Sequence, residues 1–311
     1  MKALSWFATI RTARQVSMSS TMESNAIMGS ALLDALNNPL FSFLRTALVA
    51  GLLSSIVFGI VGTYVVTKRI TYIAGAIAHC ALGGIGFALY AKHELGWTAF
   101  DPMIGALLSA IGSALLIGCV VLARSEREDT IIGAVWVTGM ALGILFVKKV
   151  RRAGVNIESW LFGNINFVSD RDLWTVSLLG AGVLLLTVLF HKQFVAICFD
   201  EEFARARGLS VPFFYLLLLC MTAVSVVLLV HVIGIIMVIA LLTLPPAIGS
   251  RLAGGLPMMM VWSIGLCALF IAAGMEISLR LNTVVGPTII LVAAAAYFLA
   301  LLISRFKRGI R

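Results

Sequence analysis

Nine apolar segments of membrane-spanning length constrain the fold of this chain more than any other feature of its sequence. A helix needs about 20 mainly apolar residues to cross the hydrocarbon core of a bilayer. Backbone polar groups in lipid find no water, and an α-helix satisfies them within the segment itself. The sequence therefore predicts an all-α, polytopic membrane helix bundle. We expect its spans at about residues 43–66, 72–91, 102–123, 131–149, 173–190, 212–232, 233–252, 257–275 and 284–303.

The composition agrees with a membrane protein and disfavours two other classes of function. Hydrophobic residues make up 61% of the 311 residues and charged residues 12%, whereas about 25% of a soluble domain is charged. The net charge of +9 is ordinary for a membrane protein, because basic residues gather in loops that face anionic lipid. We therefore predict no nucleic-acid partner. The five cysteines lack CxxC spacing, which favours buried thiols over disulfides or a zinc cluster.

The longest apolar run, residues 212–252, must contain a turn. As one helix it would be about 60 Å long, which is twice the thickness of the hydrocarbon core. We expect the break between His231 and Gly234, so that nine spans place the two termini on opposite sides of the membrane. The positive-inside rule does not choose an orientation, because either arrangement puts about half of the 23 basic residues in the inner loops.

The chain divides into three parts of unequal length. Residues 1–30, rich in Ser, Thr and Met, are predicted to be an N-terminal extension that is extracytoplasmic or disordered. An over-long start is the alternative, because Met28 precedes the first amphipathic stretch. Residues 31–305 form the predicted transmembrane domain, and residues 306–311 form a basic tail.

The sequence predicts no enzyme chemistry on this chain. No stretch matches GxxxxGK[S/T], the loop that holds nucleotide phosphates, and no Ser-His-Asp or paired-carboxylate pattern is present. Energy for any transport must then come from another subunit or from an ion gradient. A gradient-driven transporter normally places several carboxylates near the bilayer midplane, and no Asp or Glu lies well inside a predicted span.

His79 is the candidate functional residue within the membrane, because it sits in the apolar segment 72–91. An imidazole in hydrocarbon is costly unless it faces a polar path or a partner. It also ligates borderline and soft metals while neutral. Two interpretations stay open at this point: a ligand that lines a metal path, and a packing histidine bonded to a neighbouring carbonyl.

The segment 191–212 holds the pattern of a short capped helix between two spans. Asp200 suits the N-cap, and Glu201 and Glu202 suit the positive end of a helix. Gly208 suits the C-terminal end, and Pro212 begins the next element. This helix is either a solvated connector or a docking site for a soluble partner.

Six motifs in chain order carry a resemblance to one family. The motifs lie at Gly75–Gly84, Glu128–Gly133, Leu161–Ser169, Asp200–Val211, Val232–Arg251 and Gly286–Thr288. Six motifs in the same order carry more weight than any one of them. Together they resemble the permease subunits of metal-ion ABC importers, the zinc/manganese/iron type, over roughly residues 31–305.

The resemblance implies a type II ABC importer-like fold and an ATP-driven complex. It implies two copies of this chain, two copies of a separate ABC ATPase and an extracytoplasmic metal-binding protein. The cargo would be a divalent zinc, manganese or iron ion, with no permanently bound cofactor. The segment 191–212 would be a cytoplasmic coupling loop, so that the N-terminus lies outside and the tail inside a bacterial inner membrane. The residues implied in ATPase coupling are Asp200, Phe203, Ala204, Gly208 and Leu209. The alternative is a gradient-driven secondary metal transporter.

The chain departs from the family pattern beside its histidine. The family usually has Asp four residues before the histidine, where this chain has Gly75, and proline where it has Gly83. The candidate metal residues are therefore His79, the neighbouring Cys80, and His231 as a transient ligand or an ordinary turn residue. This ligand set holds an imidazole, a thiolate if Cys80 takes part, and no carboxylate. Such soft and borderline ligands favour zinc over manganese.

Overall fold

The computed structural model describes residues 42–97, 100–123, 127–150 and 170–309. The described residues are almost entirely helical and contain no strand. The predictions for residues 1–30, for the Leu161–Ser169 motif and for the last two residues of the tail concern residues outside these ranges. The helices are α3 (Ser42–Thr67), α4 (Thr71–Glu94), α5 (Pro102–Ala123), α6 (Glu128–Lys149), α8 (Asp170–Phe199), α9 (Glu201–Ala206), α10 (Val211–Ile233), α11 (Ile235–Leu252), α12 (Leu256–Leu281) and α13 (Val285–Gly309).

The described helices confirm the predicted membrane bundle. Nine of them are long and apolar enough to cross a membrane, and α9 is too short to do so. The break predicted near 231–234 lies at Gly234, whose φ of 90° ends α10 at Ile233 before α11 begins at Ile235. A positive φ of this kind is easily adopted only by glycine. The helix α13 continues to Gly309, across the predicted boundary between membrane domain and tail.

The helix α8 is longer than the sequence pattern indicated. The predicted span ends at residue 190, where Phe190 has non-helical angles of φ −114° and ψ 16°. Helix resumes after this kink and continues to Phe199. Phe194 and Ile197 beyond the kink are fully buried, so this last segment packs on the bundle. Residues 191–199, expected within the coupling loop, are therefore helix.

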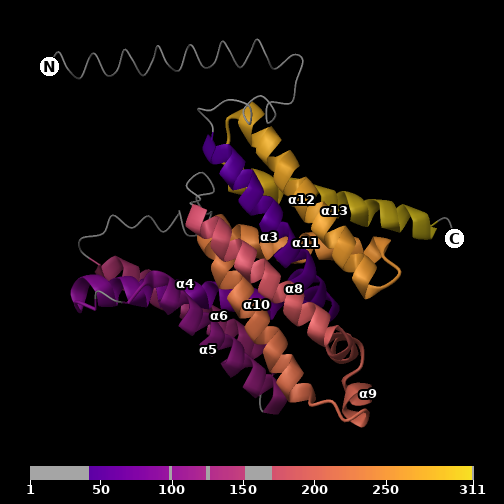
Figure 1. The fold of residues 1–311 in the computed structure, drawn as a ribbon, viewed down its shortest axis with the longest axis horizontal. Helices are drawn as coiled ribbons and strands as arrows, with labels where there is room; N and C mark the ends of the chain where they lie inside the picture. The colour runs from indigo at the N-terminus through magenta and orange to yellow at the C-terminus, as the bar shows by residue number, and fades with distance from the viewer. Residues whose placement is uncertain (1–41, 98–99, 124–126, 151–169, 310–311) are drawn as a thin grey trace.

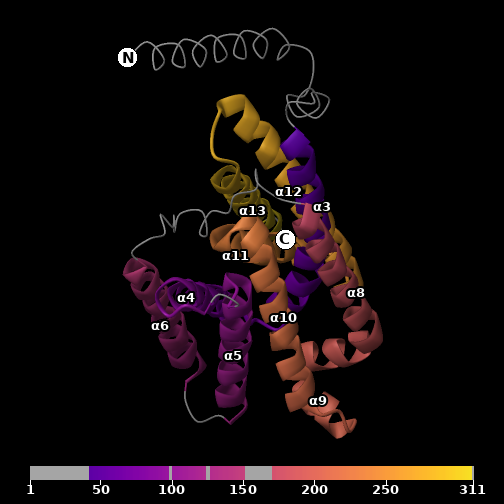
Figure 2. The ribbon, with the colours of Figure 1, turned by 60° about the vertical axis from the view of Figure 1, so that its left-hand side comes forward.

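The spans form two groups joined by α10 (Figures 1 and 2). The helix α4 packs closely against α5 and α6 in the first group, and α3 packs with α11 and α12 in the second. The helix α13 lies on the outside of α11 and α12, while α8 runs beside α3 and α10. The helix α4 is the most enclosed span: 78% of its apolar window is buried, against 17% for α6 and α13.

Glycine allows the close packing around α4. A Cβ atom on Gly84 would lie 2.1 Å from the carbonyl oxygen of Gly105 in α5. A Cβ atom on Gly139 in α6 would lie 2.6 Å from the Cys80 sulfur. Small residues at such crossings let helix backbones approach within a membrane, where no hydrophobic force drives them together. This packing fixes the surroundings of His79.

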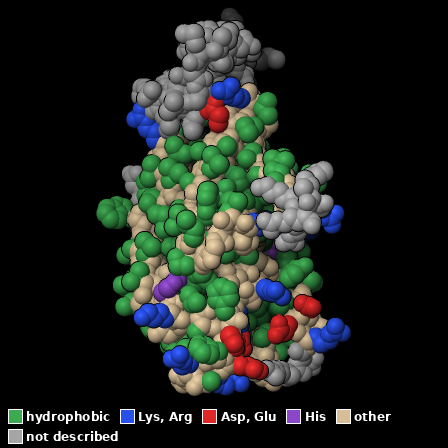
Figure 3. Space-filling view, turned by 90° about the vertical axis from the view of Figure 1, so that its right-hand side faces the viewer, with side chains coloured by type: hydrophobic (Ala, Val, Ile, Leu, Met, Phe, Trp, Pro, Cys, Tyr) green, Lys and Arg blue, Asp and Glu red, His purple; other side chains and the backbone are tan. Residues whose placement is uncertain are grey.

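Charged side chains mark the ends of the bundle. Figure 3 shows that most acidic and basic side chains on one face gather at its two ends, with apolar side chains covering the band between. This distribution is what a bilayer requires of a spanning bundle, because charge at the hydrocarbon centre is costly.

Candidate metal path and docking helix

His79 lies in α4 with its ring stacked on Trp136 of α6. The ring centroids are 4.8 Å apart and the planes differ by 20°. The Nδ1 atom is buried and has no hydrogen-bond partner among the described residues. Among the described residues, the histidine is therefore not bonded to a neighbouring carbonyl through this atom. A buried polar nitrogen without a partner costs about 1–3 kcal/mol. The His79 residue as a whole is half-buried, and its Nδ1 atom is free to bind a metal ion.

Trp136 accounts for the glycine at position 75. A Cβ atom on Gly75 would lie 3.0 Å from Cζ3 and 3.2 Å from Cη2 of Trp136. Gly75 and His79 are one helical turn apart and share a face. A side chain at position 75 would therefore press against the indole, which would have to shift by a few tenths of an ångström to admit it. In this structure the described neighbour of His79 on that face is the aromatic ring of Trp136.

Cys80 has a different environment from His79. Its Sγ donates to the carbonyl oxygen of Val135 in α6 at 3.2 Å, and the residue is 5% exposed. The Ser109 hydroxyl of α5 donates to the Cys80 carbonyl oxygen at 2.6 Å. These contacts join α4 to both of its neighbours, so the thiol has a structural partner already.

The described residues bring no metal cluster together: no group of three His, Cys, Asp or Glu side chains is placed to hold one ion. His231 belongs to the last turn of α10, and its side chain lies outside the described part of the structure. Among the three candidate metal residues, His79 alone has a described, unpartnered donor atom. A single imidazole suits a transient ligand better than a resident metal site.

The second candidate site, α9, has both ends capped as the sequence predicted. The Asp200 carboxylate accepts from the Phe203 N–H at 2.9 Å, which is an N-cap. At the other end, Leu209 N–H donates to the Ala204 carbonyl and Gly208 N–H to the Arg205 carbonyl, both at 3.0 Å. With Gly208 at φ 78°, these bonds form a Schellman motif. Six residues of helix are thereby held in a defined conformation.

The five residues implied in coupling divide between the inside and the outside of α9. Ala204 is fully buried, and Leu209 is partly buried against the chain's own core. Phe203 is 52% exposed, with the Arg207 guanidinium 5.1 Å from its ring centroid. Phe203 is therefore the large apolar side chain of α9 that a partner can reach, whereas Leu209 packs on the bundle.

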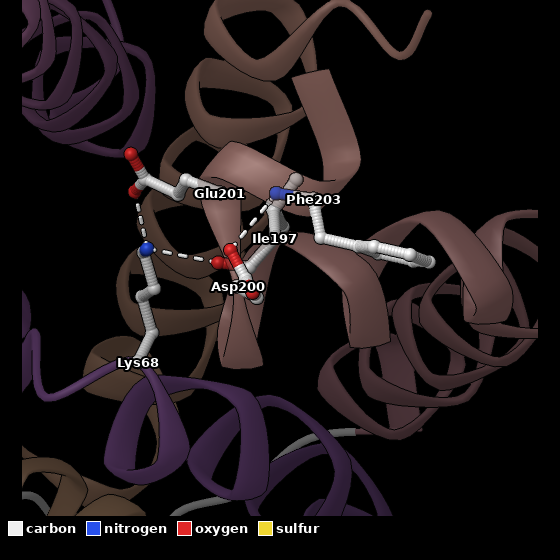
Figure 4. Close-up of polar contacts among 5 residues, drawn as sticks. All are labelled: Lys68, Ile197, Asp200, Glu201 and Phe203. Carbon is white, nitrogen blue, oxygen red and sulfur yellow. Dashed lines mark hydrogen bonds and ion pairs between the residues drawn. The ribbon is translucent and has the colours of Figure 1, made fainter. Parts of the chain in front are cut away.

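Lys68 is a polar contact of α9 that the sequence did not single out. Its ammonium donates to the Ile197 carbonyl at 2.8 Å and forms an ion pair with Glu201 (Figure 4). Lys68 follows α3, so the contact joins two ends that are 133 residues apart in the chain. One helical turn earlier, the Tyr64 hydroxyl lies 3.2 Å from Nδ1 of His191, just past the α8 kink. In the sequence, the only sign of this contact was a basic pair, Lys68 and Arg69, between the first two predicted spans.

Comparison with known proteins decides which family this architecture belongs to. The model of the ABC 3 transport family matches residues 40–304. The chain belongs to the ABC 3 transport family. The resemblance to permease subunits of metal-ion ABC importers is thereby confirmed.

Relatives of this ABC 3 family member cover most of its length. A Chlamydia pneumoniae protein named "probable metal transport system membrane protein" is 39% identical over 267 residues, which are 86% of this chain and 90% of the relative. The manganese transport system membrane protein MntC of Halalkalibacterium halodurans is 31% identical over 87% of this chain and 90% of its own. The solved structure of PsaBC from Streptococcus pneumoniae in complex with Fab is 29% identical, with a TM-score of 0.75, over 86% of this chain and 94% of that one. The permease fold is confirmed.

Proposed function

We propose that this ABC 3 family member is the membrane permease of an importer that carries a divalent transition metal into the cytoplasm, driven by a separate ATPase. The family match over residues 40–304 carries the proposal. Relatives named for metal or manganese transport support the cargo. His79 supplies a ligand of suitable chemistry inside the most enclosed span.

The positions of the carboxylates in the described spans bear on whether transport is driven by ATP or by an ion gradient. In the described spans, carboxylates lie at or near helix ends, and Glu276 of α12 pairs with Arg280 at 2.6 Å. Coupling to protons or sodium usually needs carboxylates near the midplane. The short capped α9 instead offers a rigid projection with one exposed phenylalanine, suited to a cleft in a soluble ATPase. This observation favours ATP-driven import over a gradient-driven secondary transporter.

The contacts of α9 indicate which chain segments share its side of the membrane. Lys68 after α3 meets Glu201 at the start of α9, so both lie at the same end of the bundle. Arg251 near the end of α11 donates to Ser304 near the end of α13 at 2.9 Å. If α9 faces the cytoplasm, the N-terminus lies outside and the C-terminus inside. An impermeant thiol reagent applied outside should label Val284→Cys but not Gly254→Cys, with the unmodified chain as baseline; the reverse would overturn the orientation.

The proposed assembly contains two copies of this chain, two ATPase subunits and an extracytoplasmic metal-binding protein, in a bacterial inner membrane. Two copies would each present one His79 imidazole to a central path. The residues proposed for ATPase coupling are the N-cap Asp200, the exposed Phe203 and the C-terminal Gly208, with Ala204 and Leu209 fixing α9 on the bundle.

The choice of metal has two supported candidates. Zinc is favoured by the chemistry of the site, because the His79 imidazole has glycine rather than a carboxylate one turn before it, at position 75. Manganese is favoured by the relatives named for it. Both ions would pass the same histidine, so competition between them separates the candidates.

The test of this function is uptake by the reconstituted complex. The permease, its ATPase and its binding protein are assembled in proteoliposomes, and entry of zinc, manganese and iron is measured with ATP on the ATPase side. We expect uptake that requires ATP hydrolysis and persists when ionophores dissipate all ion gradients, with zinc winning a direct competition with manganese. Uptake abolished by ionophores and indifferent to ATP would overturn the ATP-driven proposal; a win for manganese would overturn the zinc preference alone.

A further inference from the structure

The Lys68 ammonium holds two successive elements at once. Its Nζ donates to the carbonyl of Ile197 in the last turn of α8 and pairs with Glu201 in the first turn of α9 (Figure 4). The Lys68 side chain is 15% exposed and that of Glu201 39%. A largely buried ammonium is costly to leave unpaired, so this contact is expected to persist as the elements move.

A second contact supports Lys68 from the same face of α3. Tyr64 precedes Lys68 by one turn, and its hydroxyl lies 3.2 Å from His191. His191 directly follows the kink at Phe190. The segment 191–199 and α9 are therefore joined to the end of α3 at two points, beyond a break that separates them from the rest of α8.

The turn after Lys68 is short and internally bonded. The helix α3 ends at Thr67 and α4 begins at Thr71. Lys68 N–H donates to the Tyr64 carbonyl at 2.8 Å, and Ile70 N–H to the Val65 carbonyl at 3.0 Å, with Arg69 at φ 64°. A displacement of the Lys68 backbone is thus passed to the start of α4, which reaches His79 after about 12 Å of helix.

We propose that Lys68 is a positioning residue through which movement of α9 is transmitted to α4, the helix that carries His79. The inference rests on the proposed function, in which an ATPase moves α9. Movement would pass from α9 through the ion pair between Glu201 and Lys68, then through the hydrogen-bonded turn after Lys68, and then to α4. The apolar contacts of α9 with its chain neighbours α8 and α10 position the helix, while Lys68 links it to α4.

The test compares metal delivered per ATP hydrolysed in the reconstituted complex. Lys68→Met keeps the apolar stem and removes the charge, and it leaves Glu201 at a site that water reaches. We expect the ratio to fall by about threefold to tenfold, with no change in the metal concentration that gives half-maximal uptake. A merely structural defect around α4 would shift that concentration. Glu276→Gln, which removes a similar ion pair on α12, is the matched control and should keep the wild-type ratio.

A charge exchange provides the second arm. Lys68→Glu should uncouple more strongly than Lys68→Met, since it opposes Glu201 and the Ile197 carbonyl. Adding Glu201→Lys should restore part of the lost ratio. A wild-type ratio in Lys68→Met, or an exchange variant no better than Lys68→Glu alone, overturns the proposal. Phe203→Ala distinguishes failure of the docking proposal from failure of the Lys68 proposal. If both Phe203→Ala and Lys68→Met keep the wild-type ratio, α9 is not the docking helix. If Phe203→Ala lowers the ratio and Lys68→Met does not, only the proposed route through Lys68 is wrong.

Discussion

The surroundings of His79 and of α9 differ in how their polar groups are bonded. His79 lies among glycine-lined apolar helices, stacked on one indole, with a buried nitrogen that no described residue bonds. The helix α9 is capped at both ends by hydrogen bonds and joined to α3 by an ion pair. One region leaves a buried polar atom without a partner among the described residues, whereas the other has hydrogen bonds at both helix ends.

The difference matches what the proposed function would require of each region. A ligand on a transport path must release its ion, so a single neutral imidazole without a carboxylate has an advantage over a closed site of three or four ligands. A helix that passes force between subunits must keep its shape, which caps and charge contacts provide. Under the proposed function, weak metal binding and mechanical rigidity would lie in separate regions, joined by the α3–α4 turn.

The largest expected effect that would break this division concerns Phe203. Phe203→Ala should weaken ATPase association about 30-fold, because an exposed aromatic anchor at an interface centre contributes about 2 kcal/mol or more. Pull-down of the ATPase with tagged permease measures this. Phe213→Ala, which removes a comparably exposed ring from the start of α10, is the control and should bind normally. Equal ATPase recovery for both variants would show that α9 is not the docking element.

A smaller effect is expected at Gly75, where the indole lies against the backbone. Gly75→Asp alone should reduce uptake several-fold, because its Cβ meets the Trp136 ring and a lone carboxylate within a membrane span is costly. Gly75→Asp with Trp136→Ala should recover uptake and shift preference toward manganese, a harder ion. Competition between zinc and manganese measures the shift. Full activity of Gly75→Asp alone, with zinc preferred as before, would show that Trp136 does not set the environment of His79.

The smallest expected effect concerns the N-cap of α9. Asp200→Ala should destabilise the helix by about 1 kcal/mol and raise hydrogen exchange at its first-turn amides, including Phe203, with a modest loss of uptake. Asp200→Asn should retain protection, since asparagine caps about as well. Protection unchanged in Asp200→Ala would mean that the contact with Lys68, rather than the cap, holds this turn.

The two regions also differ in how far their structure could be predicted from sequence. The ends of α9 depend on neighbours within a few residues, so Asp200 and Gly208 revealed both caps. The positions of the spans depend on the length and hydrophobicity of each segment, and both can be read directly from the sequence. The Trp136 stack and the Lys68 ion pair join helices far apart in the chain, and a single sequence carries no record of such pairing. Phe190 likewise looked like the end of a span, because a kink and a terminus share the same local pattern.

The central claim is that metal passes His79, and the initial rate of zinc uptake by reconstituted His79→Ala tests it most directly. His93→Ala is the matched control, because His93 lies near the end of the same helix and its Nδ1 lies 3.0 Å from the Leu89 carbonyl oxygen one turn away. We predict that His79→Ala retains its ATPase and loses uptake by at least about tenfold, while His93→Ala transports at the wild-type rate. A wild-type rate for His79→Ala across all zinc concentrations would contradict the account and leave His79 as a packing residue.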